Sequence, residues 1–425
     1  MKYNEETRRS DKIPYDNKPI IRQPSNNTSG RRSDKTAKAG FGLSLIVFIL
    51  VALNVVLSAL VFTLLKNNTG SQANTTINIQ TSGDIDVSAV VSKCRPSVVR
   101  IHAGFPTGVN ASATVDYSLF SRFKSKGSGV IFQDNKDAGV CYIVTCYHVI
   151  RGYDSQIYVI LNDSFNPLKA TLVSSSSYSS NFDIAVIKIE SSLYTESSAG
   201  PAEIADSSLI LEGDKCVAYG NPQGTGFGVT SGDISKTVDL VTVGGVVNRV
   251  MRVSAAINGG NSGGGLFDAS GKLIGIVHSK TGDTPSTSTY IDNIAFAIPS
   301  DVAISLAKNI LKNNRPLKAD LGITLGVANK NETYDIVNGR QIPKQTIIVT
   351  QASDGADFKV NDQIVSFIYD GNIVNVRNLY SVDDHIFNFG VGDVVTFEVM
   401  RGGSLMSVEV TITSMVGADT EMWYN

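Results

Sequence analysis

The residue with the clearest chemical setting is Ser262, in the run 257–268 that reads INGGNSGGGLFD. Asn261 precedes it, and glycines stand on both sides. A run so rich in glycine is either a flexible linker or a sharp turn whose backbone N–H groups come close to a reacting oxygen, where a Cβ would interfere. A serine hydroxyl is a poor nucleophile until a base takes its proton. The turn interpretation therefore requires a base elsewhere in the chain.

Two residues could activate that serine. His148 lies near the end of the apolar run YIVTCYHVI, and Asp183 stands at the start of FDIAVIKIE, a run typical of a buried strand. A buried aspartate is rare without a partner, and a histidine would provide one. Taken singly, the three residues could be a structural histidine, a turn aspartate and a loop serine. Their order, His148, Asp183, Ser262, is that of the catalytic triad in a chymotrypsin-like double barrel.

The elements that would position these residues are short strands. From residue 88 onward, β-branched runs alternate with clusters of Gly, Asn, Asp and Ser, and no long helical pattern intervenes. This spacing predicts a mainly β unit, a barrel or sandwich of about 200 residues. The first helix is expected at 299–314, with Ser300 as its N-cap and Pro316 beyond its end. We assign residues 88–314 to this unit.

The N-terminal part of the chain has a different composition. Residues 1–39 are polar and predict a disordered tail, and residues 40–66 contain an uncharged apolar run long enough to cross a bilayer. The alternative, a cleaved signal peptide, has a shorter apolar core near the N-terminus. Basic residues precede the run, so the tail is expected in the cytoplasm and everything after residue 66 outside it. Residues 67–87 predict a flexible stalk.

Composition excludes some classes of function. The formal net charge of −2 argues against a nucleic-acid-binding protein. The four cysteines, Cys94, Cys141, Cys146 and Cys216, are too few for a disulfide scaffold of this size and show no CxxC spacing. Free buried thiols and structural bridges both remain open.

The strings GNSGGGL, TCYHVI, FDIAVIKI, GSGVIF, AYGNP, TSGDIS and FAIPSDVA resemble those of the HtrA (DegP-like) serine proteases, over roughly residues 88–415. The resemblance implies His148 as general base, Asp183 as its orienting carboxylate and Ser262 as nucleophile. It implies an oxyanion hole made by the N–H groups of Gly260 and Ser262. It also implies homotrimers and no metal or cofactor.

The resemblance also suggests where substrates bind. Ile257 would line the S1 pocket with the strand around Ile276 and Val277, and an apolar pocket suits small or medium aliphatic P1 residues. Alternatively, Ile257 belongs simply to the core. Neutral Asn261 cannot pair with a newly cut N-terminus, so we expect no proteolytic zymogen activation.

Four positions depart from the family pattern. The family commonly has Asn at Cys146, Pro at Gly259, Pro at Gly265, and Ser or Thr at His278. His278 could donate a second hydrogen bond to Asp183, face the substrate cleft, or be a surface residue on a strand edge.

Residues 315–416 resemble one PDZ domain, followed by a tail at 417–425. Leu321, Gly322 and Ile323 would offer N–H groups to the terminal carboxylate of a peptide. The peptide would lie between a strand beginning at Ile323 and a helix at about 376–387. A packing domain without a ligand is the alternative.

These features together predict a membrane-anchored, extracytoplasmic bacterial endopeptidase that degrades misfolded or exported proteins in protein quality control under stress. A second hypothesis is a catalytically idle chaperone or scaffold that binds peptides through the PDZ domain. A third is a regulatory protease that cuts one signalling partner.

Overall fold

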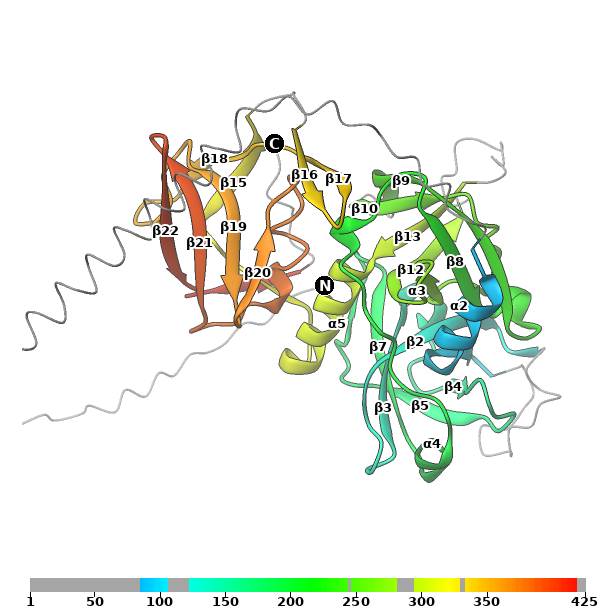
Figure 1. Ribbon diagram of the computed structural model, residues 1–425. Helices are drawn as coiled ribbons and strands as arrows, with labels where there is room; N and C mark the ends of the chain where they lie inside the picture. The colour runs from blue at the N-terminus through cyan, green and yellow to red at the C-terminus, as the bar shows by residue number, and fades with distance from the viewer. Residues whose placement is uncertain (1–84, 106–121, 244–245, 281–293, 329–332, 419–425) are drawn as a thin grey trace, which may run out of the picture. The chain divides into compact units, whose positions relative to one another are not determined.

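The computed structural model describes residues 85–105, 122–243, 246–280, 294–328 and 333–418 (Figure 1). The predicted tail 1–39, the apolar segment 40–66 and nearly all of the stalk 67–87 lie outside the described residues, as does most of the tail 417–425. Of the helices in the described residues, none has the length and apolar character needed to cross a bilayer.

The first part of the fold is an antiparallel sheet of seven strands that closes on itself through β3 and β7. Its order is β3-β2-β1-β4-β5-β7-β6. The strands are β1 (Val98–Ala103), β2 (Ser125–Asn135), β3 (Val140–Cys146), β4 (Ile157–Ile160), β5 (Leu168–Leu172), β6 (Tyr178–Ser179) and β7 (Ile184–Glu190). Short helices accompany them: α2 (Val87–Cys94), η1 (Arg95–Ser97), α3 (Tyr147–Ile150) and α4 (Ser192–Glu196). Strands such as β1, buried along their whole length, form the barrel core.

The second part is a closed barrel in the order β10-β13-β12-β11-β8-β9. Its strands are β8 (Lys215–Gly220), β9 (Gly228–Val243), β10 (Val246–Val253), β11 (Gly265–Phe267), β12 (Leu273–Lys280) and β13 (Ala295–Pro299). Two 3-10 turns, η3 (Ser207–Leu209) and η4 (Pro222–Gly224), flank β8. The predicted mainly β unit is confirmed as two barrels, the architecture of a chymotrypsin-like protease.

Helix α5 (Ser300–Asn313) follows the second barrel almost where the sequence predicts a helix. Its apolar residues Ala303, Leu306 and Ile310 are fully buried. Its C-cap is Asn314, which adopts the left-handed conformation with φ of 58°. The predicted N-cap is wrong, because Ser300 is already helical and its hydroxyl donates to the carbonyl of Ala205, 3.3 Å away.

The remaining residues form a second β domain. Its main sheet contains β15 (Ile323–Val327), β18 (Ile347–Ala352), β19 (Gln363–Tyr369), β21 (Val394–Arg401) and β22 (Ser404–Thr411), with β20 (Asn372–Asn375) paired to β19. Strands β16 (Thr333–Val337) and β17 (Arg340–Lys344) form a separate hairpin, and β14 (Leu317–Ala319) pairs with β23 (Met415–Gly417).

The helix predicted at 376–387 is not present. The chain there makes turns and one 3-10 element, η5 (Ile386–Asn388). The Ser381 hydroxyl accepts hydrogen bonds from the N–H groups of Arg377 and Asn378, and the Asn378 side chain accepts one from Tyr380. Such local side-chain bonds to the backbone compete with helix formation, which explains the error.

The segment that contains η5 packs on α5 and on the first barrel. Asn309 of α5 donates to the carbonyl of Phe387 at 2.7 Å, and Asn388 donates to Ser305 at 3.2 Å. The ring of Phe387 meets that of Phe182 edge to face at 5.3 Å. The second domain is therefore tied to the protease barrels close to Asp183.

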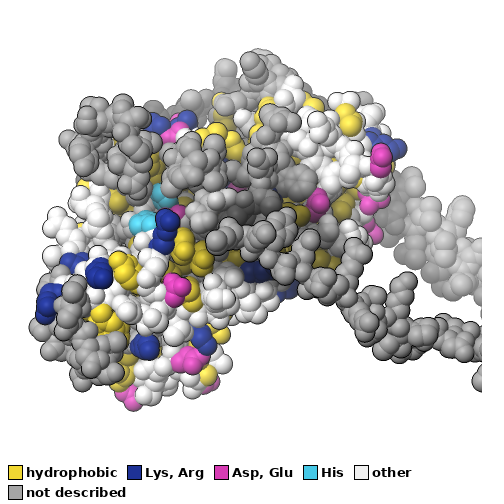
Figure 2. Space-filling model, turned by 180° about the vertical axis from the view of Figure 1, so that it is seen from behind, with side chains coloured by type: hydrophobic (Ala, Val, Ile, Leu, Met, Phe, Trp, Pro, Cys, Tyr) yellow, Lys and Arg dark blue, Asp and Glu magenta, His cyan; other side chains and the backbone are white. Residues whose placement is uncertain are grey.

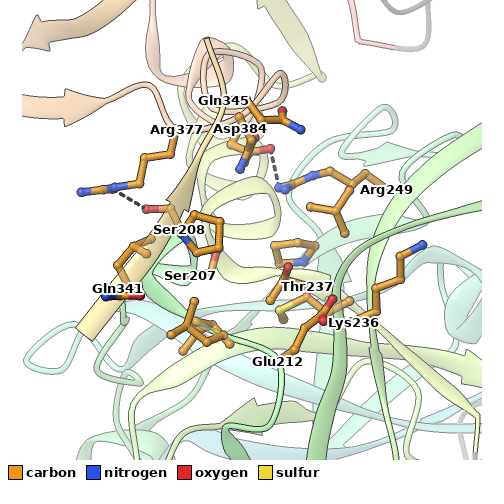
Figure 3. Close-up of a pocket in the computed structure, with 18 residues that line it drawn as sticks. Ser207, Ser208, Glu212, Lys236, Thr237, Arg249, Gln341, Gln345, Arg377 and Asp384 are labelled. Carbon is orange, nitrogen blue, oxygen red and sulfur yellow. Dashed lines mark hydrogen bonds and ion pairs between the residues drawn. The ribbon is translucent and has the colours of Figure 1, made fainter. Parts of the chain in front are cut away.

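A buried ion pair also connects the second β domain to the second barrel. Arg249 of β10 and Asp384 lie 2.5 Å apart at the side of a cavity of about 610 Å³ (Figure 3). On the face that Figure 2 shows, described acidic and basic side chains are both scattered, in keeping with the small net charge.

Neighbouring Asp383 has a buried Oδ2 that accepts no hydrogen bond from the described residues. Burial and, to a smaller extent, the Asp384 charge together raise the pKa of Asp383 to about 7, against the opposing charges of Lys318 and Arg249. An unfolded aspartate has a pKa of about 3.9. Between these two values the folded chain holds a proton that the unfolded chain has released, so stability falls as pH rises through this window.

Asp383→Asn removes this titration while keeping the shape of the side chain. We expect the variant to be more stable than the wild type at pH 8 by about 2–4 kcal/mol, and to lose less stability between pH 4 and pH 7. Urea unfolding at several pH values measures both effects. Equal slopes against pH in the two proteins would contradict this assignment.

Candidate active site

The pairing of β3 with β7 brings His148 and Asp183 together. In this antiparallel ladder Cys146, the last residue of β3, faces Ile184, the first residue of β7. The residues just beyond must therefore meet, and the N–H of Tyr147 donates to the Asp183 carbonyl at 3.0 Å. His148 then lies on the one-turn helix α3, directly over the aspartate.

Asp183 is held by three hydrogen bonds. Its Oδ1 accepts the backbone N–H of His148 at 2.8 Å, and its Oδ2 lies 2.6 Å from His148 Nδ1 and 3.1 Å from His278 Nε2. Its backbone has a φ of 51°, a conformation that is uncommon for aspartate. Burial favours the neutral acid, but the hydrogen bonds and charges of the two histidines outweigh it and hold the pKa of Asp183 well below its ordinary value. Asp183 is therefore a carboxylate throughout the neutral range.

The residues around Ser262 form a packed turn, so the linker interpretation is wrong. Ser262 is only 7% exposed, and its carbonyl accepts the N–H of Ser128 at 2.9 Å. Gly263 has a φ of 83°, and a Cβ there would overlap the Ser128 carbonyl and the Thr145 hydroxyl. The absence of a side chain at Gly263 thus allows the turn to pack directly against the end of β3, the strand that leads to His148.

The peptide group between Gly259 and Gly260 is oriented by the loop after β8. The N–H of Gln223 donates to the Gly259 carbonyl at 2.6 Å. In a trans peptide the C=O and the following N–H point in opposite directions, so the Gly260 N–H faces away from Gln223. Gly260 has a φ of 97°, and a Cβ there would overlap the carbonyl of Asn221. Within the described backbone, the Gly260 and Ser262 N–H groups donate to no carbonyl, as an oxyanion hole requires.

Sequence reasoning did not assign a role to Gln223 or to Ser128. The Ser128 hydroxyl donates to the Gly260 carbonyl at 2.7 Å and accepts the N–H of Asn221 at 2.8 Å, so it ties the serine turn to the Gln223 loop. Ser128 lies in GSGVIF and Gln223 directly follows AYGNP, two strings that resemble the family, and this location was the available signal.

The expected substrate-binding residues are divided between two packing clusters. Ile257 and Val277 share the apolar cluster of the second barrel, and both are nearly fully buried. Ile276 belongs to the other cluster, because neighbouring residues of a strand point to opposite faces. Only Val277 of this pair therefore shares the surroundings of Ile257. His278 is 5% exposed and faces Asp183, which excludes the surface alternative.

The described cysteines are all free and buried, including Cys146 at the end of β3. The ligand atoms of Cys146, His148 and Asp183 lie within 4.8 Å of one another. No other group of three or more such residues in the described part of the chain is arranged closely enough to hold a metal ion.

The expected carboxylate-binding loop of the second domain is partly occupied by the protein itself. The N–H of Gly322, which has a φ of 64°, donates to Asp320 at 2.9 Å. Leu321 and Ile323 are buried at its two sides. Strand β15 ends its sheet and, among the described strands, pairs with β18 alone.

Comparisons with known proteins show which families and solved structures this chain is similar to. Residues 127–276 match the family described as a trypsin-like peptidase domain. The chain is 30% identical over 307 residues to the serine protease Do-like HtrA of Lactococcus lactis subsp. lactis, an alignment that covers 69% of this chain and 71% of the relative. It is 28% identical to the protein of the same name from Lactococcus lactis subsp. cremoris, over 82% of this chain and 87% of that one. Among solved structures, the HtrA-type protease AlgW with tripeptide is 25% identical, with a TM-score of 0.47 over 77% of this chain and 96% of that chain.

The role of the Gln223 amide can be tested with two substitutions. Gln223 has a φ of 56°, so Gln223→Gly should keep both the backbone conformation and the N–H. Gln223→Pro removes the N–H and forces a negative φ. We expect the proline variant to lose about 10²–10³-fold in kcat, the cost of one oxyanion donor, and the glycine variant to stay near the wild type. Steady-state kinetics on a peptide substrate would measure this, and equal activity in the two variants would refute the role.

Proposed function

The chain belongs to the HtrA (Do-like) family of serine proteases and is a serine endopeptidase, and we propose that it is a membrane-anchored, extracytoplasmic enzyme that hydrolyses misfolded or exported proteins. The observation that carries the catalytic part is the 2.6 Å contact between His148 Nδ1 and Asp183 Oδ2, made beside the packed Ser262 turn.

In the proposed mechanism Ser262 Oγ attacks the carbonyl carbon of the scissile peptide bond, and His148 Nε2 takes the hydroxyl proton. Asp183 accepts the Nδ1–H of His148, which fixes the tautomer that leaves Nε2 free to act as a base and stabilises the imidazolium that forms. The oxyanion accepts hydrogen bonds from the N–H groups of Gly260 and Ser262. His148 then gives its proton to the leaving amine, and water hydrolyses the acyl-enzyme by the same steps.

Unfolded proteins are the substrate class that best fits the proposed binding residues. Ile257 and Val277 are apolar, and an uncharged S1 pocket lined by them would accept small or medium aliphatic side chains. Folded proteins bury such residues, whereas misfolded chains expose them. His278 follows Val277 in β12. In this scheme it does not contact the substrate but stabilises the Asp183 carboxylate.

The second domain is proposed to be a PDZ domain that binds the C-termini of peptides. The outer edge of β15 supports this, because an extended peptide can add to an unpaired strand edge. The proposed carboxylate loop is Leu321, Gly322 and Ile323, in which the Gly322 N–H would exchange its bond to Asp320 for one to the peptide. Since no regular helix forms at 376–387, the other wall of the groove would be the turns that precede η5.

The location rests on the sequence. Residues 40–66 would anchor the chain in the cell membrane, with the N-terminus cytoplasmic and the protease domain outside. HtrA proteins commonly form oligomers, and we propose a homotrimer.

The catalytic proposal predicts a strict dependence on Ser262. The wild type should degrade an unfolded protein such as reduced, alkylated casein and should react with a fluorophosphonate probe. Ser262→Ala should lose about 10⁶-fold in kcat and all labelling, because the hydroxyl that attacks the substrate and the probe is removed. Gel-based proteolysis and probe fluorescence would measure both. Similar cleavage by the two proteins would favour the idle-scaffold hypothesis.

The PDZ proposal predicts that binding depends on a free carboxylate. A fluorescent peptide with an aliphatic C-terminal residue should bind Ser262→Ala protein at least about 10-fold more tightly than the same peptide with a C-terminal amide, because the amide carries no charge for the loop. Fluorescence anisotropy would measure the two affinities. Equal affinities would show that the domain does not recognise a C-terminus through this loop.

A further inference from the structure

We propose that Cys146, His148, Asp183 and His278 form a zinc-binding site inside the catalytic centre, and that zinc bound there reversibly inhibits the protease. The inhibitory part of this inference rests on the proposed function of His148 and Asp183, whereas the metal site itself does not. Zinc is not required for activity in this scheme.

The donor atoms are of the kinds that zinc binds. Cys146 offers a sulfur, His148 a ring nitrogen and Asp183 a carboxylate oxygen, all within 4.8 Å of one another. Zinc bonds of about 2.0–2.3 Å place ligand atoms at most about 4.5 Å apart, and about 3.3–3.8 Å apart in a tetrahedron. Shifts of a few tenths of an ångström to about 1 Å would bring the three atoms onto such a shell.

A second imidazole stands at the same carboxylate. His278 Nε2 lies 3.1 Å from Asp183 Oδ2, and its ring centroid is 6.1 Å from that of His148. A mixed set of thiolate, imidazole and carboxylate ligands suits zinc better than calcium or magnesium, which prefer oxygen alone.

The site is enclosed but has a route to solvent. Cys146 is fully buried, and His278 and Asp183 are 5% and 7% exposed. The His148 side chain is 45% exposed, so an ion can reach the group from solvent past the histidine ring. Low exposure of the other ligands would slow its release.

Zinc at this position would stop catalysis through the tautomer of His148. Coordination uses Nδ1, the atom that faces Asp183, so the remaining proton of the neutral ring must be on Nε2. A protonated Nε2 has no lone pair with which to take the Ser262 proton. Cys146 gives its thiol proton to solvent, His148 and His278 each keep one proton on the nitrogen that does not bind the metal, and Asp183 remains a carboxylate. Chelation of the ion reverses every step.

Cobalt(II) provides a direct test of the site, independent of activity. Full-chain Ser262→Ala protein titrated with cobalt chloride should develop a near-ultraviolet band from thiolate-to-cobalt charge transfer, and zinc should displace it. Cys146→Ser in the same background should lack the band. Cys141→Ser is the matched control, because Cys141 is an equally buried thiol on the same strand, and it should keep the band.

Activity tests the inhibition. With Ser262 present, the wild type and Cys141→Ser should be inhibited by micromolar zinc and recover with a chelator. Cys146→Ser and His278→Ser should need at least about 10–100-fold more zinc, each measured against its own zinc-free rate. Cys146→Asn, which places the residue common in the family, serves if the serine variant does not fold, as circular dichroism would reveal.

The possible outcomes separate the two proposals. Absence of a thiolate band, or equal zinc sensitivity in the wild type and the Cys146 variants, overturns the zinc site. A thiolate band in a chain whose wild type is inactive without zinc would support the site and refute the proposed function instead.

Discussion

The buried carboxylate of Asp183 is the interaction on which the site depends. An aspartate with so little exposure is stable as an anion only when donors replace the water it has lost, and here three donors do so: the backbone N–H of His148 and the rings of His148 and His278. These donors come from α3 and β12. The Asp183 charge therefore holds α3, which carries His148, against β12, which carries His278 and lies beside the serine turn. The pKa of Asp183 is low because these hydrogen bonds stabilise the carboxylate relative to the neutral acid.

The backbone around this charge leaves little freedom. The register of β3 against β7 determines that residue 183 meets residue 147, and the left-handed conformations of Gly260 and Gly263 determine where the serine turn touches the first barrel. Ser128 and Gln223 then hold the peptide groups on either side of Gly260. The oxyanion donors are therefore oriented by one residue of β2 and one of η4, and neither residue carries out a chemical step.

The parts of this site that depend on side-chain chemistry were predictable from the sequence, and the parts that depend on backbone contacts were not. The triad could be predicted because a histidine after an apolar strand, an aspartate before one and a serine among glycines occur in the chain order of a known catalytic triad. Few other functions explain all three residues in that order. Gln223 acts through an N–H that every residue except proline has, so no residue type identifies it. The helix that the PDZ resemblance implied at 376–387 does not form for a related reason, because the Asn378 and Ser381 side chains bond to the backbone locally. Likewise, spacing alone could not decide whether Ile276 or Val277 faces Ile257.

The second histidine at Asp183 changes the balance of the triad. Oδ2 divides its negative charge between two imidazoles, so His278 stabilises the carboxylate while reducing the attraction that it exerts on the imidazolium of His148. A serine or threonine hydroxyl at position 278 could donate a similar hydrogen bond but would be a poor zinc ligand. An asparagine at position 146 would likewise remove the sulfur. Cys146 and His278 therefore matter together, because only the combination of a thiol and a second imidazole would turn an orienting carboxylate into the centre of a metal-binding set.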